Sequence, residues 1–427
     1  MSNTISAERL LRHAERDVAT RPGPVTSGAA AIGRFVLGRA TNDRLIVDDV
    51  VAGRTPQRRV FGAPAGELAP DAVAAHVTVL DDRAYAALVC EGSIGFGRGF
   101  IERWWTSDDP VAVVRFAIRN MDGIDRLRNR TRRWTGWASD AIRTALPRDS
   151  RERNREDIGA HYDIGNDFFS LFLDETMTYS SAVFPTPSSS LADASRHKYD
   201  LLLDRLGVRE GDHLLEIGTG WGGMALRAAE RGIRVTTTTI SSEQHAEASR
   251  RVAEAGFADR VTLLTDDWRD LTGTYDAVVS IEMIEAVDWR DYDAFFALID
   301  RSLVAGGRAA IQAICLPDDR WERAKNTEDF IRRFVFPNGF LPSVGAIDRS
   351  VRRATTFQMV EVDDYTEHYA ETLHRWRVAF DDQLAAAAAL DLDERFQRLW
   401  RMYLAYCEAA FLERHCLLHQ LTFQKVG

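Results

Sequence analysis

A glycine-rich turn, "EIGTGWGG" from Glu216 to Gly223, is the first stretch of the sequence whose residue types could bind a ligand. Glycines let the backbone approach a bound molecule closely, and the helix that follows points free N–H groups towards it. A dinucleotide turn would have the spacing G-x-G-x-x-G, with a carboxylate about 20 residues later at the end of the second strand. Here Gly218 and Gly220 are followed by both Gly222 and Gly223, and the second predicted strand ends in "TTI" at residues 238–240, without a carboxylate. The pattern therefore disfavours NAD.

Acidic and aromatic residues at the predicted strand ends indicate a different nucleotide. Glu216 opens the turn, and Asp266, Asp267 and Trp268 follow the third predicted strand. A hydrogen-bond acceptor beside an aromatic face suits adenine. A glycine-rich turn kept only for tight packing would not explain this agreement between strand ends. The arrangement resembles that of the S-adenosylmethionine-dependent methyltransferases.

Helix and strand patterns alternate from about residue 197, and they would position these residues. The predicted strands are "HLLEIG", "IRVTTTTI", "RVTLLTDD", "YDAVVSIEMIEAV" and "GGRAAIQAI", separated by helical patterns such as "KYDLLLDRLGV" and "SSEQHAEASRRVAEAG". Such alternation predicts an α/β fold, a doubly wound, mostly parallel sheet with helices on both faces.

The length of the chain predicts more than one domain, because single cores stop growing at about 250–300 residues and this chain has 427. Residues up to about 110 read as short strands and turns, which favours a smaller α+β domain. We expect an amino-terminal domain at 1–120, an arginine-rich linker at 121–160 and the main domain at 161–427. In its tail, "DERFQRLWRMYLAYCEAAFLERHCLLHQLTF", apolar residues recur at helical spacing, and core packing is favoured over the wall of a ligand tunnel.

Charge excludes one class of function. The net charge of −10 argues against a nucleic-acid-binding protein. Arginines gather between Arg126 and Arg153, with Trp134 and Trp137 among them. This stretch is either a solvated helix face or an attachment site for anionic lipid headgroups, where each basic side chain contributes about 1 kcal/mol.

Cysteines and the amino terminus provide little evidence of another class. The four cysteines are too scattered for a disulfide framework or a zinc site. In "HCLLH", His415, Cys416 and His419 could share a helical face, but ordinary packing is the favoured interpretation, and no metal is expected. The amino terminus has neither the apolar core of a signal peptide nor a spanning segment, so a cytoplasmic protein is the default expectation.

Six motifs, in this order, resemble those of the cyclopropane-fatty-acid synthase family of methyltransferases: "HYDIGNDFFSLFLDETMTYSSAVF", "LLEIGTGWGG", "TTISSEQ", "EMIEAV", "FVFPNGFLPS" and "HYAETLHRW". The resemblance covers essentially the whole chain, because "GSIGFGRGFIERWW" is similar to the end of that family's lipid-binding amino-terminal domain. It implies a class I, Rossmann-like methyltransferase domain with S-adenosylmethionine as cofactor. The aromatic first motif would fold over the cofactor as a lid and wall an acyl-chain tunnel.

The resemblance also assigns residues to the cofactor. In the lid, Tyr179 and Ser180 would touch its methionine end. The remaining cofactor residues that it implies are Glu216, Gly218, Gly220, Thr239, Ile240, Gln244, Asp267, Trp268 and Ile281. Ser241 and Ser242 also fit a helix N-cap, so their role is left open.

The same resemblance implies a bound bicarbonate as the base that removes a proton. Its ligands would correspond to Ser181, Glu285, Gln312, Ile314 and Tyr369. Three residues depart from the family pattern: Ser181 stands where cysteine is common, Gln312 where histidine is expected, and Ala286 where "FEH" has its histidine. A glutamine can still hydrogen-bond an anion but cannot shuttle protons. For Glu285, a strand-end carboxylate pairing with an arginine is the structural alternative.

These departures favour one product. "EMIEAV" and "AIQAI" are similar to the actinobacterial branch that converts oleoyl phospholipids into 10-methylene products, precursors of tuberculostearic acid. The alternative is a cyclopropane synthase that closes the ring, and the rivals from other classes are a small-molecule O- or N-methyltransferase and a non-catalytic lipid carrier. The substrate would be a phospholipid acyl chain in a bilayer, reached by peripheral contact with the anionic inner membrane surface. This interpretation is compatible with a separate reductase as a partner and with assembly as a homodimer.

Overall fold

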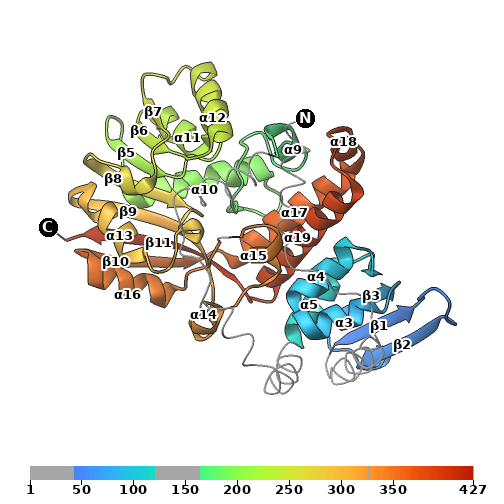
Figure 1. Cartoon of the computed structure of the whole chain (residues 1–427). Helices are drawn as coiled ribbons and strands as arrows, with labels where there is room; N and C mark the ends of the chain where they lie inside the picture. Colours follow the sequence, from blue (N-terminus) through green and yellow to red (C-terminus); the bar gives the residue numbers. More distant parts are fainter. Residues whose placement is uncertain (1–42, 121–163, 326, 338, 427) are drawn as a thin grey trace.

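A computed structural model describes residues 43–120 and 164–426, apart from residues 326 and 338. Two sheets organise this part of the chain, a four-stranded sheet in the amino-terminal part and a seven-stranded sheet in the rest (Figure 1). The predicted linker at 121–160 and its arginine run lie outside the described residues, so the domain boundaries stay a prediction.

The seven-stranded sheet has the order β10-β11-β9-β8-β5-β6-β7. Its strands are β5 His213–Ile217, β6 Arg234–Thr238, β7 Val261–Leu264, β8 Tyr275–Ile281, β9 Leu303–Cys315, β10 Phe357–Asp364 and β11 Leu417–Lys425. All neighbours from β9 to β7 pair in parallel, whereas β11 runs antiparallel to both β9 and β10. The predicted doubly wound, mostly parallel sheet is confirmed. The strand order reverses between β5 and β8, and ligands bind at the carboxyl ends of the strands at such a point.

Both faces of this sheet are covered, as the apolar strands require. Leu214 and Leu215 are adjacent in β5 but belong to different hydrophobic cores, because successive strand residues point to opposite faces. One core is completed by α10 Leu191–Leu206, α11 Gly223–Glu230 and α12 Ser242–Glu254, and the other by α13 Tyr292–Arg301 and α16 Val344–Ala354. This rigid frame positions the loops at the strand ends.

The helices α17 Thr366–Asp382 and α19 Glu394–Leu412 lie between this sheet and the amino-terminal elements (Figure 1). Core packing of the predicted helical tail is confirmed, since the apolar residues that define its pattern are all buried, namely Phe396, Leu399, Trp400, Tyr403 and Phe411. Their core is shared with the lid, where α9 Asn166–Phe169 forms, and with the short helices α15 Phe330–Phe334 and α18 Leu384–Ala389. Helix α14 Asp318–Ala324 belongs to a core of the seven-stranded sheet through Trp321. Lid, tail and amino-terminal part therefore pack as one apolar body.

The amino-terminal part combines a sheet of order β2-β1-β3-β4 with three helices. The strands are β1 Arg44–Asp49, β2 Gln57–Gly62, β3 Ala74–Val79 and β4 Trp105–Thr106, and the helices are α3 Arg83–Glu91, α4 Ser93–Ile101 and α5 Pro110–Arg119. Reading the stretch up to about residue 110 as strands and turns was therefore wrong for α3 and α4. The glycines of α4 serve close packing: a Cβ on Gly97 would lie 2.1 Å from the Phe330 ring, and one on Gly95 would lie 2.2 Å from the Ala87 carbonyl oxygen.

The last part of the predicted helical tail is a strand. Helix α19 ends at Leu412, and β11 then inserts between β9 and β10, so His415, Cys416 and His419 do not share a helical face. The His415 ring contacts the Arg320 guanidinium. Within the described ranges, no group of three or more metal-binding side chains converges. Over the same ranges, no helix is long and apolar enough to cross a membrane.

Candidate active site

The glycine-rich turn follows β5 at the switch point of the sheet. Gly218, Gly220 and Gly222 have φ values of 103°, 52° and 87°, a region that side chains with a Cβ rarely adopt. The N–H groups of Gly218 and Thr219 donate to the Thr238 carbonyl, which fixes the turn against β6. No side chain caps the start of α11, so its first N–H groups remain for a ligand. The turn thus has the geometry of a nucleotide cradle.

Two buried charged groups lie beside this turn. Glu216 in β5 is 2% exposed, and its Oε2 atom has no hydrogen-bond partner in the structure. Desolvation raises the pKa of Glu216 to about 8. Lys198 of α10 is fully buried, its Nζ donates to Ser180 Oγ at 2.6 Å, and desolvation lowers its pKa to about 8. An unpartnered carboxyl oxygen at the turn suits the hydroxyl and amino donors of S-adenosylmethionine.

The end of β6 supplies the residues predicted for the ribose side. Thr239 Oγ1 donates to Gln244 Oε1 at 2.8 Å, so the two side chains are held together at the strand end. Ser241 is the N-cap of α12, with its Oγ accepting from the Gln244 N–H, which favours the structural alternative for Ser241. Ser242 is exposed and begins the helix.

The two residues predicted to bind adenine, Asp267 and Trp268, both follow β7 in the chain. Asp267 precedes the 3-10 turn Trp268–Asp270, and its carboxylate accepts from the Arg269 backbone N–H and guanidinium at 3.0 and 3.1 Å. The Arg269 guanidinium also covers one face of the buried Trp268 ring, 4.6 Å from its centroid. Ile281 ends β8 and is half-buried. The arginine that pairs with Asp267 was not foreseen from the sequence.

A second carboxylate, that of the half-buried Glu282, accepts hydrogen bonds from three of the residues predicted to hold bicarbonate. Its Oε1 accepts from the Ser181 backbone N–H at 2.9 Å and from Gln312 Nε2 at 2.8 Å, and its Oε2 accepts from the Tyr369 hydroxyl at 2.7 Å. Gln420 Nε2 donates to Gln312 Oε1 at 2.8 Å and so orients the amide. Desolvation raises the pKa of Glu282. Four elements, the lid, β9, α17 and β11, therefore meet at this carboxylate.

Glu285 occupies a different place from the one predicted. It lies in the 3-10 turn Ile284–Ala286, where its Oε1 accepts from the Ile314 N–H at 2.6 Å and its buried Oε2 has no partner. Desolvation and the charge of Glu282 raise its pKa to about 8. The predicted set is thus split: Ser181, Gln312 and Tyr369 hydrogen-bond Glu282, and Ile314 alone hydrogen-bonds Glu285. Glu282 was not predicted from the sequence, because a carboxylate near the carboxyl end of a parallel strand is a signal that fits Glu282 and Glu285 equally.

Aromatic rings pack around Tyr369, the residue whose hydroxyl donates to Glu282. The Tyr179 hydroxyl shares a 2.9 Å hydrogen bond with the Tyr403 hydroxyl, and the Tyr179 ring lies 5.4 Å from the Trp376 ring. The Tyr369 ring stacks on Phe411 at 4.4 Å and meets Trp376 edge-on at 6.3 Å. The lid also reaches the glycine-rich turn, because Trp221 Nε1 donates to Asn166 Oδ1 at 2.6 Å. Faces of such rings attract cations.

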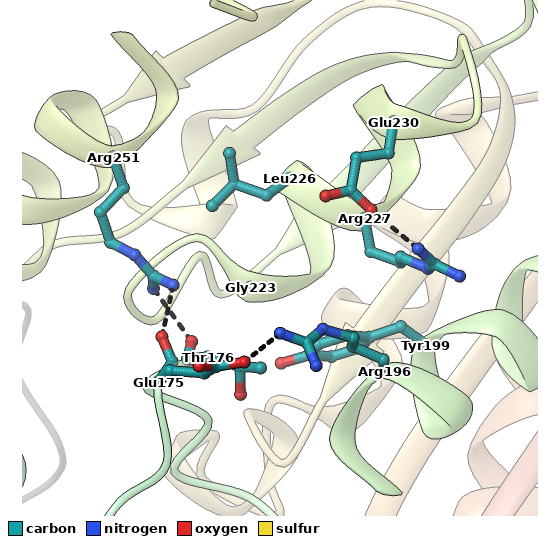
Figure 2. A pocket seen from close by; sticks show the side chains of 9 residues that line it. All are labelled: Glu175, Thr176, Arg196, Tyr199, Gly223, Leu226, Arg227, Glu230 and Arg251. Carbon is teal, nitrogen blue, oxygen red and sulfur yellow. Dashed lines mark hydrogen bonds and ion pairs between the residues drawn. The ribbon is translucent and has the colours of Figure 1, made fainter. Parts of the chain in front are cut away.

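A charged hollow of about 110 Å³ on the outer side of α10 and α11 is not part of this site (Figure 2). Its arginines point at groups within the hollow itself: Arg251 donates to the carbonyls of Glu175 and Thr176, and Arg227 pairs with Glu230 at 2.8 Å. These contacts attach the lid to the sheet domain.

Comparison with known proteins agrees with this geometry. The family model of mycolic acid cyclopropane synthetases matches residues 149–421. The chain belongs to this family. A tuberculostearic acid methyltransferase of Mycobacterium tuberculosis is 38% identical over 95% of this chain and 93% of the relative. The cyclopropane-fatty-acyl-phospholipid synthase of Escherichia coli is 31% identical over 82% of this chain and 88% of the relative.

Solved structures give the same assignment. A mycolic acid cyclopropane synthase in complex with SAH and CTAB aligns with a TM-score of 0.59 and 32% identity, covering 64% of this chain and 98% of that one. A cyclopropane synthase from Mycobacterium tuberculosis aligns with a TM-score of 0.60 and 30% identity, covering 64% and 98%. The protein is a methyltransferase, and its cofactor is S-adenosylmethionine.

The buried carboxyls of this methyltransferase predict how its stability changes with pH. Burial raises the pKa of Glu216 and of Glu285 to about 8, above the ordinary glutamate value of 4.5, so the native state holds protons that the unfolded state has lost. The free energy of unfolding should therefore fall as pH rises from 6.5 to 8, by up to about 1.4 kcal/mol per pH unit for each carboxyl. Urea unfolding without cofactor at both pH values measures this, and Glu216→Gln should flatten the dependence.

The matched control for this measurement is Glu210→Gln, at an exposed position just before the opposite end of β5. Its pH dependence should equal that of the wild type. A wild-type stability that is constant or rises over this window would contradict the prediction.

Proposed function

We propose that this methyltransferase transfers a methyl carbon to the cis double bond of an oleoyl-type phospholipid acyl chain and yields a 10-methylene branch. The observation that carries the proposal is a buried carboxylate, Glu282, placed between the glycine-rich turn and a wall of aromatic rings. A heteroatom methyltransferase acting on a small polar molecule would have no use for such an apolar wall. The names of the relatives support an unsaturated acyl chain as substrate, and the Escherichia coli relative is named for phospholipid.

S-adenosylmethionine supplies an electrophilic methyl group on a sulfonium centre. Glycines 218 and 220, with Glu216, would hold it at the switch point, while Thr239 and Gln244 take the ribose side and Asp267 and Trp268 the adenine. The lid, with Tyr179 and Ser180, would close over its methionine end, and Ile240 and Ile281 would add apolar contact. An alkene is a weak nucleophile, so the site must align it in line with the methyl group and exclude water.

The aromatic wall would then stabilise the positive charge that develops on the acyl chain. The rings of Tyr179, Tyr369 and Trp376 present faces and edges in a space without bulk water, where cation–π attraction is worth about 2 kcal/mol or more. No side chain of the wall is a strong nucleophile that would trap a cation. Loss of one proton from the new methyl group completes either product, and the ring-closing cyclopropane synthase remains the second candidate.

The relative with 38% identity favours the methylene product, because its name is tuberculostearic acid methyltransferase. Gln312 supports the same choice: an amide cannot carry a proton away, so proton removal depends on a neighbouring group. The proposed substrate also defines the position of the double bond and the headgroup, so the same experiment tests both.

Mass spectrometry of the product tests the proposal. The purified protein is incubated with dioleoyl phosphatidylglycerol vesicles and S-adenosylmethionine carrying a trideuterated methyl group. We expect one added carbon that keeps two of the three deuterium atoms and, after derivatisation, an olefin at the branch. A saturated product of the same mass would indicate a cyclopropane, and an added group with all three deuterium atoms would contradict both candidates. No added carbon would favour the carrier.

Contact with the membrane surface is a further part of the proposal, since the substrate lies in a bilayer. The arginine stretch between Arg126 and Arg153 would bind anionic headgroups on the cytoplasmic side. The protein should sediment with phosphatidylglycerol vesicles and not with phosphatidylcholine vesicles, and equal sedimentation with both would contradict this contact. A homodimer and a separate reductase stay predictions.

A further inference from the structure

The groups that would hold a bicarbonate already have an anion. Three donors surround Glu282: the Ser181 N–H at 2.9 Å, Gln312 Nε2 at 2.8 Å and the Tyr369 hydroxyl at 2.7 Å. All belong to residues that the family resemblance assigns to bicarbonate. A second anion in contact with the Glu282 carboxylate would suffer like-charge repulsion in a buried site. The residues present therefore do not fit a bound bicarbonate.

We propose that the Glu282 carboxylate occupies the place of that anion and is itself the base that takes the proton from the transferred methyl group. This inference rests on the proposed function and names a catalytic residue for it. Carboxylate and bicarbonate both present two planar oxygens to hydrogen-bond donors, so the same three donors serve either group. The protein would thus carry its base covalently.

The position of Glu282 fits this role. It follows the last residue of β8, and the next residue, Met283, has its Cβ and Cγ 3.3 Å from where a Cβ on Gly218 would stand. Glu282 is thus adjacent in sequence to a residue that lies against the glycine-rich turn. On its other side, Tyr369 connects it to the aromatic wall. The methyl donor and the acyl chain would meet between these two features.

The backbone of Glu282 is held in a conformation that a glutamate rarely adopts. Its φ is 49°, in the left-handed region, which costs about 1–2 kcal/mol for a residue with a Cβ. Such strain persists only where surrounding contacts determine the geometry, and it gathers at functional sites. Three hydrogen bonds from elements far apart in the sequence hold Glu282 in this conformation.

The electrostatic surroundings keep the group able to accept a proton. Burial raises the pKa of Glu282, which makes the carboxylate a stronger base, and the nearby Lys198 ammonium opposes complete neutralisation. The neighbouring Glu285, with a pKa of about 8, is mostly protonated at pH 7 and adds little repulsion.

The proton transfer balances as follows. The π electrons of the alkene form the bond to the methyl carbon, while the electron pair of the broken S–CH₃ bond goes to sulfur. A hydride then shifts from the methyl-bearing carbon to its cationic neighbour. Glu282 takes a proton from the methyl group, and that C–H electron pair becomes the C=CH₂ double bond of the methylene branch. The protonated carboxyl returns its proton to solvent after product release.

The alternative is that Glu282 only anchors the lid to β9 and α17. Glu282→Gln separates the two roles, because the amide oxygen can accept from Ser181 and Gln312 and the amide nitrogen can donate to the Tyr369 oxygen. We expect turnover with dioleoyl phosphatidylglycerol vesicles to fall about 100-fold or more, with the dissociation constant of S-adenosylmethionine within twofold of wild type, at a temperature where circular dichroism shows both proteins to be folded. A purely anchoring residue would leave turnover within a few-fold. The control Glu210→Gln should behave as wild type.

Bicarbonate dependence provides the second measurement. Wild-type turnover should be the same in carbonate-free buffer and in the same buffer with added bicarbonate. Glu282→Gly relieves the strained φ and removes the carboxylate, so it should be inactive alone and regain activity with added bicarbonate or formate. Bound ¹³C-bicarbonate should be detected by NMR for this variant and not for wild type.

The outcomes separate the two proposals. Wild-type turnover that requires bicarbonate, or full activity of Glu282→Gln, would overturn the role of Glu282 and leave the proposed function standing. Wild-type protein that transfers no carbon under either condition would overturn the proposed function, and the assignment of Glu282 as its base with it.

Discussion

Replacing Gly218 by valine should weaken the binding of S-adenosylmethionine about 100-fold or more. Gly218 has a φ of 103°, which a β-branched residue cannot adopt without strain, and an added Cβ would lie 3.3 Å from the Met283 side chain. Either the turn moves or the valine side chain fills the space that the cofactor needs. Titration calorimetry with S-adenosylmethionine measures the dissociation constant.

Gly211→Val is the matched control for this variant. Gly211 has a φ of 89° in the turn just before the other end of β5, and nothing lies within 4 Å of an added Cβ. It should share the loss of stability that the strained backbone causes, on the order of 1–3 kcal/mol, without the loss of affinity. Equal affinities of the two variants would contradict the assignment of the turn to the cofactor.

Replacing Lys198 by methionine should be the most destabilising change at the site. Lys198 is fully buried, and its charge interacts most strongly with Glu282, then with Asp174 and Glu216. Removing one member of a group of buried charges leaves the others uncompensated and costs about 3–5 kcal/mol. Urea unfolding at pH 7 measures the loss. Lys325→Met, which removes an amine paired with the exposed Glu322, should cost no more than about 1 kcal/mol.

A double-mutant cycle identifies the partner of this charge. In the Lys198→Met background, Glu282→Gln removes the uncompensated carboxylate, so it should recover part of the lost stability. We expect a coupling energy between the two positions of about 1–3 kcal/mol. Strictly additive effects would mean that the Lys198 ammonium and the Glu282 carboxylate do not interact.

Glycine content misled the sequence analysis in one segment. The stretch around Gly95, Gly97 and Gly99 was read among strands and turns, since glycines are typical of turns between strands. In the structure it is α4, and the missing side chains allow close contact with α3, with the Phe330 ring and with the Trp105 ring. Tertiary packing outweighed local propensity there. The same holds for β11, which was predicted as part of the helical tail and forms a strand between β9 and β10.

The cofactor half of the site was determined by the sequence alone. Local sequence patterns predict the order of strands and helices. They also predict the glycine-rich turn and the polar residues after β6 and β7. The parallel sheet then brings the ends of β5, β6 and β7 to one edge whatever the rest of the chain does. For that reason the sequence alone places Glu216, Thr239 and Asp267 at one edge of the sheet, and their contact with the cofactor stays a prediction.

The catalytic half was decided by the tertiary structure. Glu282 and Glu285 stand three residues apart in "EMIEAV", and nothing local distinguishes the two carboxylates. The donors that select Glu282 come from positions 101, 30 and 87 residues away, in the lid, β9 and α17. A positive φ at Glu282 and the 3-10 turn after it aim the two side chains at different partners. Which carboxylate meets which donor depends on how distant elements pack, and no sequence spacing encodes that.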